Sequence, residues 1–314
     1  MDEFYNRAGA ANALEKEARE RRTLAAENYS PTFQHLADLN LDASSVIEGG
    51  ACRKNWRLCI PCESDGVLDE VVFGVQGVIT NLGLVPIAVG KVDHKRAIKL
   101  AQRVEVSGFN TPTFEEALNK LETANDRFSQ HFRGQGVQKI SPPNGQFGRS
   151  IACSNRLFTL RMDNPTEQGT DFEAGIDPLG TLEKLISSEM FHSTDNIVKY
   201  YTRGTDLKDG ITTFVGGFPG SFKIGDIVEV QASLVSIKTA DGGLKLTCRL
   251  HALTMLDNSF TKLASSRRMA SRKRPVAVAA IRCRVGHFET GVLESKKARM
   301  IDEDKRMIED NVMD

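Results

Sequence analysis

Cysteine and histidine side chains are the first candidates for chemistry in this sequence, since both bind metals and both take part in catalysis. Cys59-Ile-Pro-Cys62 forms a CxxC pair, and Cys52 lies just upstream. A structural zinc site needs four ligands and usually two such pairs. The second pair is missing, although His35 or His94 could complete a set. Zinc, a redox role and free thiols all stay open, and free thiols, with no metal and no cofactor, are the favoured interpretation.

The other histidines offer one candidate for acid–base catalysis. His192 lies three residues before Asp195, and such a pair can transfer protons. The sequence contains no Gly-x-Ser-x-Gly motif, no complete dinucleotide fingerprint and no phosphate-binding loop. We therefore favour polar residues that lead into a strand, and we expect no catalytic residue and no enzyme.

A dense basic run near the C-terminal end offers a binding function instead. Residues 262–275 read KLASSRRMASRKRP, with six positive charges and no acid. Clusters of this kind are recognised by nuclear import receptors or bind phosphates. The alternative is a solvated linker whose charges balance the acidic tail. The candidate nucleic-acid-binding residues in this run are Arg267, Arg268, Arg272, Lys273 and Arg274.

Two matched strands upstream of the run would present further cations. In residues 227–238 (IVEVQASLVSIK) and 244–253 (LKLTCRLHAL), apolar and polar residues alternate around an Asp-Gly turn. The alternation slips near residues 234–235 and again near 252–253, which indicates β-bulges or bends. Lys245, Arg249 and His251 lie on the polar side and are our candidate nucleic-acid contacts. For the aromatic residues nearby we favour the core over base stacking (Tyr200, Tyr201, Phe214, Phe218 and Phe222).

This part of the sequence resembles a group of uncharacterised proteins from mushroom-forming fungi. The matching stretches are HSTDNIVKYY, FPGSFKIGDIVEVQASLVSIK and LKLTCRLHALTMLD, all within about residues 192–260. The group brings no biochemical activity, so the resemblance implies no catalytic residue. The hairpin also resembles, in its pattern, the central strands of OB-fold domains.

Further patterns predict how the rest of the chain is organised. Residues 7–28 predict an Ala/Glu/Arg helix with a thin apolar stripe, and residues 71–90 predict strand–turn–strand with the turn near Asn81. Asp93 predicts a short helix, and Thr111-Pro112 predicts a longer one with Phe114 among its core positions. The expected regions are a helical arm (1–30), an α/β region (31–132), a Gly/Pro basic linker (133–150), an antiparallel β domain (151–262), a basic segment with a possible strand (263–288) and a disordered charged tail (289–314).

Composition limits the classes of protein to consider. The chain has 314 residues, and 41 Lys and Arg balance 41 Asp and Glu. This neutrality excludes a globally basic nucleic-acid binder but not a locally basic one. A hydrophobic content of 40% excludes wholesale disorder. Six cysteines in a chain of this length favour a reducing intracellular compartment. The uncharged stretch 71–90 could span a bilayer, but its glycines, Asn81 and Pro86 favour core strands, so we expect no membrane partner.

Together these patterns predict an α+β protein. An N-terminal α/β region precedes an antiparallel β-barrel-like domain, for which an OB-like form is the specific candidate, and a flexible C-terminal tail. We expect a non-enzymatic, intracellular and preferably nuclear protein that binds single-stranded nucleic acid. The alternative is a structural or protein-interaction module whose basic run serves only for binding an import receptor.

Overall fold

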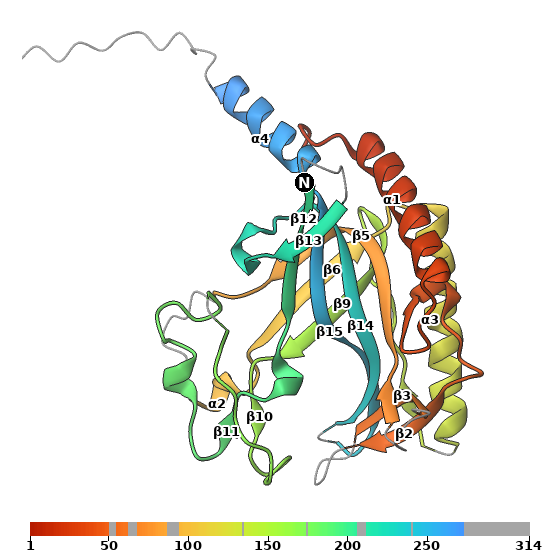
Figure 1. Ribbon diagram of the computed structural model, residues 1–314, viewed down its shortest axis with the longest axis vertical. Coiled ribbons are helices and arrows are strands. Elements are labelled where there is room, and N and C mark those ends of the chain that lie inside the picture. Colours follow the sequence, from red (N-terminus) through yellow and green to blue (C-terminus); the bar gives the residue numbers. More distant parts are fainter. Residues whose placement is uncertain are drawn as a thin grey trace, which may run out of the picture. The chain divides into compact units, whose positions relative to one another are not determined.

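The structure is a computed structural model that describes residues 1–49, 55–61, 68–86, 94–133, 135–173, 175–205, 212–239 and 241–272. The chain forms two compact units, Met1–Met269 and Ala270–Asp314. The description below concerns the first unit, to which nearly all described residues belong. It has a mixed α+β architecture built on one large sheet (Figure 1).

Five strands form a closed ring within this sheet. They are β5 (Val72–Gly83), β6 (Ala101–Ser107), β9 (Gly148–Arg156), β14 (Ile227–Lys238) and β15 (Leu244–Asp257). β5 pairs with β6, β6 with β9, β14 with β15 and β14 with β5, all in antiparallel orientation. β9 and β15 are parallel, with Cys153 opposite Cys248. Each of the five strands is therefore hydrogen-bonded to two others.

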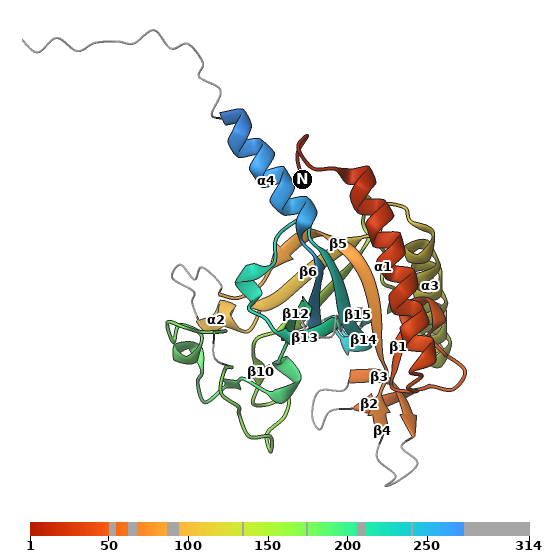
Figure 2. The ribbon, with the colours of Figure 1, turned by 45° about the horizontal axis from the view of Figure 1, so that its top comes forward.

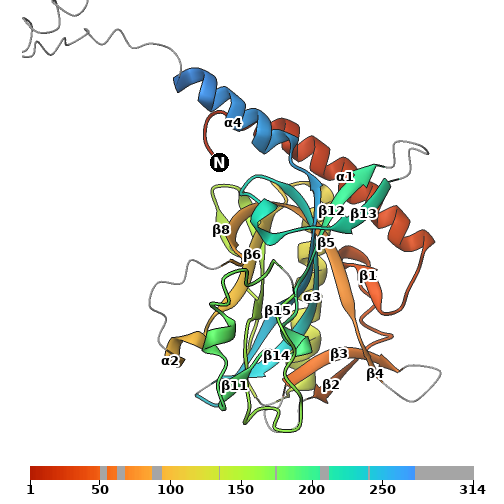
Figure 3. The same ribbon diagram turned by 60° about the vertical axis from the view of Figure 1, so that its left-hand side comes forward.

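Shorter strands extend the ring on several sides. β12 (Lys199–Thr205) runs parallel to β15 and pairs with β13 (Thr212–Gly216), which Figure 3 shows beside α1. The remaining strands are β1 (Phe33–His35) on β5, β3 (Asn55–Pro61) on β14, β2 (Ser45–Gly49) and β4 (Leu68–Glu70) on β3, β7 (Val137–Gln138) on β15, β8 (Asn144–Gly145) on β9, and the separate pair β10 (Thr159–Leu160) and β11 (Met190–Phe191). The described single 3₁₀ turns are η1 (Leu36–Asp38), η2 (Glu183–Leu185), η3 (Thr194–Asn196) and η4 (Pro219–Ser221).

The predicted hairpin is confirmed by β14 and β15. Gln231 pairs with Ala252, but the next residue, Ala232, pairs with Leu250, so the register shifts by one residue between them. His251 is therefore the extra residue of a bulge, next to the second predicted slip. The first predicted slip, at residues 234–235, leaves the pairing intact. Both side chains there are buried, so both faces of β14 are covered at this point.

The helix predicted after Thr111 is confirmed as α3 (Pro112–His131). Its four predicted core side chains are at most 2% exposed: Phe114, Leu118, Leu121 and Phe128. They share one apolar core with side chains of the five-stranded ring, including Val104, Cys153, Val230 and Leu250. The helix pattern was sufficient here because its apolar stripe faces a large core.

The helix predicted at residues 7–28 is confirmed as α1 (Arg7–Glu27), which begins after the N-cap Asn6. The expectation that it is a weakly packed, solvated arm is wrong. Ala10, Leu14 and Ala18 are buried, and α1 lies beside α3 and β5 (Figure 2). Its apolar stripe is thin, so polar contacts described below supply much of its attachment.

Two predictions around β5 and β6 are wrong. β5 continues unbroken past Asn81 to Gly83, so no turn lies there. Residues 72–78 pair with β14 and residues 78–83 pair with β6, with a register shift at Thr80, so backbone pairing keeps the strand extended through Asn81. Residues 73–79 are buried, which accounts for the absence of charge in this part of the run. The short helix predicted from Asp93 is only the single turn α2 (His94–Ala97), and the residues soon after it form the strand β6. Asp93 and residues 87–92 lie outside the described residues. The alternation of Val104 and Val106 with Arg103 and Glu105 was the signal for this strand.

The segment 133–150 joins α3 to β9 and contains β7 and β8. β9 pairs with β6, which precedes the segment, and with β15, which follows it. One sheet therefore contains strands of the expected α/β region and of the expected β domain. Downstream, β9 ends at Arg156 and β10 follows after a short break, and the segment after Asp177 contains only the single turn η2.

A close approach at Gly108 fixes the connection between β6 and α3. A Cβ atom on Gly108 would lie 2.2 Å from the Cβ of buried Phe114. We expect Gly108→Ala to lower the free energy of unfolding by about 1–3 kcal/mol, because a Cβ cannot rotate away from the added methyl. Gly83→Ala is the control, since no atom of the described residues lies within 4 Å of its added methyl. Urea denaturation should separate the two variants, and equal effects would contradict the expectation.

Candidate functional site

Alternate side chains of β14 form a polar stripe on the outer side of the ring. Glu229, Gln231 and Ser233 lie on this side, while Val228 and Val230 join the apolar core. The polar stripe contacts two clusters of charged residues, one beneath α1 and one beside β3 and η3. The sequence pattern predicted the polar side of the hairpin but not the residues that meet it.

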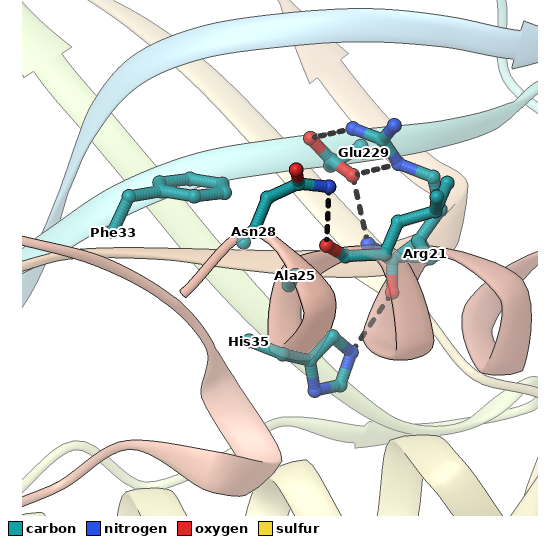
Figure 4. A pocket seen from close by; sticks show the side chains of 9 residues that line it. Arg21, Ala25, Asn28, Phe33, His35 and Glu229 are labelled. Carbon is teal, nitrogen blue, oxygen red and sulfur yellow. Dashed lines mark hydrogen bonds and ion pairs between the residues drawn. The ribbon is translucent and has the colours of Figure 1, made fainter. Parts of the chain in front are cut away.

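The cluster beneath α1 surrounds the carboxylate of Glu229, which is 2% exposed. Arg21 donates to it twice, from Nε at 2.7 Å and from Nη2 at 2.9 Å. Gln76 donates at 2.9 Å and Gln231 at 3.1 Å. The other end of Gln76 accepts from His35 Nε2 at 2.9 Å, and His35 Nδ1 accepts a backbone N–H at 3.2 Å (Figure 4). Every oxygen of the buried carboxylate is thus satisfied by side chains from α1, β5 and β14.

The charge states of this cluster follow from burial and from its partners. Burial alone would raise the pKa of Glu229, but the hydrogen bonds and charge of Arg21 hold that pKa below its ordinary value. Burial lowers the pKa of His35, and the hydrogen bond to Gln76 opposes this only in part. The cluster therefore contains an ion pair and a neutral imidazole at neutral pH.

The second cluster joins two arginines to two acids on the outer side of β3 and β15. Asp195 accepts from Arg57 Nη2 at 2.6 Å and from Arg249 Nη1 at 3.0 Å. Arg57 also donates to Glu70 at 2.8 Å. Burial and the charge of Arg57 lower the pKa of Arg249. The charges of the four residues balance, so this cluster is an ion-pair network and not a bare cationic patch.

A serine and a histidine complete the second cluster without forming a nucleophilic site. Ser233 Oγ donates to Glu70 Oε1 at 2.5 Å and lies 2.8 Å from His251 Nε2. Because the hydroxyl proton is directed to Glu70, His251 must donate to Ser233 and cannot accept its proton. Burial lowers the pKa of His251, which favours this neutral form. The arrangement positions side chains and does not activate a nucleophile.

The predicted nucleic-acid contacts on the hairpin are thus placed unequally. Lys245 is exposed at the start of β15 and has no ion pair within the described part of the chain. Arg249 is tied to Asp195, with 17% of its side chain exposed. His251 is the bulge residue and contacts Ser233. Of these three residues, Lys245 alone is exposed and lacks an ion pair with any residue that the structure describes.

The basic run begins as helix α4 (Ser259–Arg272). Arg267 is exposed, and Arg268 donates to Asp2 at 2.8 Å. Arg272 is the last residue of the helix. Lys273 and Arg274, with the tail beyond them, lie outside the described residues.

The candidate catalytic and metal-binding groups do not converge. His192 Nδ1 donates to the carbonyl oxygen of Leu157 at 2.8 Å, whereas Asp195 is bound by the two arginines described above. Cys59 is buried on β3, and Cys52 and Cys62 lie outside the described residues. The described residues hold no group of three or more His, Cys, Asp or Glu side chains arranged for a metal ion.

A third polar surface, which the sequence analysis missed, lies on β6 and β9. Arg103 of β6 and Arg156 of β9 are exposed. Ser154 of β9 lies between two arginines, because it pairs with Arg103 of β6 on one side and with Arg249 of β15 on the other. Arg96 and Lys99 are exposed in the connection that precedes β6. Recognition of β6 as a strand would have placed Arg103 on the outer side.

Comparisons with known proteins do not assign this site. No protein-family model matches the chain, and no similar protein was found among the curated proteins. Within the residues that the structure describes, none of the helices is both long and apolar enough to cross a membrane.

Proposed function

We propose that this protein binds single-stranded nucleic acid through an OB-like barrel formed by β5, β6, β9, β14 and β15. The strand order of the ring carries the proposal. Counted in chain order, the first three strands are consecutive neighbours, and the fourth, β14, returns after a long connection to lie beside the first, β5. This is a Greek-key arrangement of five strands, the arrangement of OB-folds.

The ligand-binding face of an OB-fold supports the same function. That face lies on the second and third strands and on the loops between strands one and two and between strands four and five. In this chain these are β6, β9, the connection before β6 and the β14–β15 turn. Arg96, Lys99, Arg103 and Lys245 are exposed there and have no ion pair within the described residues. Such cations bind phosphates without regard to sequence.

The aromatic side chains contribute less to this proposal. Tyr200 and Phe222 are buried in the core, in agreement with the favoured interpretation. Phe214 and Phe218 are 37% and 64% exposed, so for these two the preference for the core is wrong. Exposed aromatic rings can stack on bases. We further propose a nuclear location, with the run that begins at Arg267 as the contact for an import receptor.

One observation favours a protein-interaction module as the second candidate. β13 is the terminal strand of the sheet, and Phe214 and Val215 on it are exposed. An edge strand with apolar side chains can accept a strand from a partner. Recovery of a partner after nuclease treatment, lost on Val215→Lys, would favour this candidate.

Fluorescence anisotropy with a labelled single-stranded oligonucleotide tests the main proposal. We expect binding at low salt that weakens steeply as salt rises, because phosphate contacts release counterions. Arg103→Glu combined with Lys245→Glu should weaken binding at least about tenfold and lower the salt slope by about 2, about 1 for each lost phosphate contact.

Lys16→Glu is the control, because Lys16 is a strongly exposed cation on α1, away from β6 and β9. It should change binding little. The proposal fails if the wild-type protein does not bind at low salt, or if a single Lys16→Glu exchange weakens binding as much as the double variant.

A further inference from the structure

A pocket of about 240 Å³ lies between the second half of α1 and the strands β1, β5 and β14 (Figure 4). It lies above the first polar cluster and not on the β6–β9 surface. The lining residues that matter for its chemistry are Arg21, Ala25, Asn28, Phe33, Gly74 and Glu229. Its volume is below the roughly 300–1,000 Å³ of pockets for drug-sized ligands, so one small ring system is the largest suitable ligand.

Arg21 is fixed in place and still has donors to offer. One edge of its guanidinium, Nε and Nη2, is bound to Glu229. The guanidinium carbon also lies 5.1 Å from the ring centre of Phe214. Nη1 has no hydrogen-bond partner among the described residues. A guanidinium held in this way can donate to a ligand without first losing its rotational freedom.

The charge of the pocket selects the kind of acceptor. Glu229 neutralises Arg21 within the pocket, so a free anion gains little net attraction. A neutral acceptor such as a ring carbonyl or ring nitrogen is the better match for Arg21. Asn28 supplies the complementary group: its Nδ2 donates to the carbonyl oxygen of Leu24 at 3.0 Å, and its Oδ1 accepts from no described residue. The pocket therefore offers both a donor and an acceptor.

The walls of the pocket favour a flat ligand. Phe33 lies on one side and Arg21 on the other in Figure 4, with Asn28 between them. Gly74 lies close to both walls, because a Cβ there would be 3.1 Å from Phe33 Cζ and 3.7 Å from the carboxyl carbon of Glu229. The absence of a side chain at Gly74 keeps this space open. An aromatic ring and a glycine backbone together form a surface on which a planar ring can stack.

We propose that this pocket binds a nucleobase, meaning a planar heteroaromatic ring with a hydrogen-bond acceptor and an N–H donor on its edge. The same chemistry is present in a free base or nucleoside and in an unpaired base of a single strand. The proposal does not require the β6–β9 surface to bind nucleic acid.

Ala25→Leu in the full chain provides the test, since this side chain would extend into the pocket while a helix-favouring residue is retained. Ala26→Leu is the matched control, because Ala26 is exposed and does not line the pocket. Saturation-transfer NMR and calorimetry with adenosine, guanosine, cytidine and uridine should detect binding to the wild type. Affinity should fall at least tenfold in Ala25→Leu and stay unchanged in Ala26→Leu. Ribose 5-phosphate, which lacks the ring, should not bind.

Three results would overturn the proposal: no nucleoside bound at millimolar concentration, ribose 5-phosphate bound as well as the nucleosides, or equal affinities of the two leucine variants. Oligonucleotide binding by the same variants distinguishes the two sources of the base. Weakening in Ala25→Leu assigns the pocket to a base of the strand, and unchanged binding assigns it to a free nucleoside. Nucleoside binding that survives in a protein unable to bind oligonucleotides would remove the proposed function and leave the pocket proposal standing.

Discussion

Arg21→Met is expected to lower the free energy of unfolding by about 3–5 kcal/mol, because it leaves the carboxylate of Glu229 buried without its cation. The Glu229 side chain is 2% exposed and that of Arg21 is 22% exposed, so solvent cannot replace the lost partner. Methionine retains the length and the helix propensity of arginine. Urea denaturation followed by circular dichroism would measure the change.

Two further variants show whether the lost charge pair is the cause. Arg19→Met makes the same substitution on the same helix, but the Arg19 side chain is 69% exposed and pairs only with Glu15 one turn away. We expect it to cost less than about 1 kcal/mol. Glu229→Gln removes the buried charge, so the double variant Arg21→Met/Glu229→Gln should be more stable than Arg21→Met alone. A double variant less stable than the single one would contradict this explanation.

The attachment of α1 also shows where sequence-based prediction ends. Glu17 and Arg21 lie one turn apart on α1, which is the usual spacing of an ion pair along a helix. In the structure, Arg21 Nε donates to Glu229 at 2.7 Å. Glu17 instead accepts two hydrogen bonds from Arg203, at 2.7 Å and 2.5 Å. Helix formation depends on local residue types and could be predicted. The partners lie about 200 positions away in sequence, and no local pattern identifies them.

The same limit applies to the sheet. α3 could be predicted because it carries a regular apolar period and buries one continuous face. β14 and β15 could be predicted because apolar and polar residues alternate along most of their length, although both faces of β14 are covered. β6 was missed because its alternation covers few residues and follows a short helix. The closure of the ring depends on the parallel pairing of β9 with β15, whose partners Cys153 and Cys248 are far apart in sequence. Neither strand alone indicates that pairing.

The candidate site was predictable to a similar extent. Alternation placed Lys245 and Arg249 on the outer side of the hairpin, where the structure has them. It could not show that Asp195, from a turn outside the hairpin, neutralises Arg249. A cation counted from sequence is available for a ligand only if the fold brings no acid to it.

Mild acidification is expected to destabilise the folded protein between pH 7.5 and 5.5. His35 and His192 are each 4% exposed, His251 is half-buried, and burial lowers the pKa of all three histidines. The unfolded chain takes up a proton at each histidine as the pH falls through about 6.5, and the folded protein does so only at lower pH. The neutral histidines therefore make their full contribution to the free energy of unfolding above about pH 6.5. As the pH falls below this value, the contribution decreases with a slope that approaches about 1.4 kcal/mol per pH unit for each histidine.

His35→Gln should remove about one proton from this dependence, because glutamine can occupy the position beside Gln76 without titrating. Two buried carboxyl groups affect this measurement in different ways. The pKa of Glu229 is lowered, so its contribution is lost only below the ordinary carboxyl range. Asp226, whose pKa burial raises, acts in the opposite direction and would make acid stabilising.

Urea denaturation at several pH values identifies the responsible groups. If the free energy of unfolding falls towards pH 5.5 in the wild type, and less steeply in His35→Gln, the effect belongs to the buried imidazole of His35. A stability that is constant or rises towards pH 5.5 would mean that His35 and His192 are protonated in the folded protein as readily as in the unfolded chain, or that Asp226 dominates.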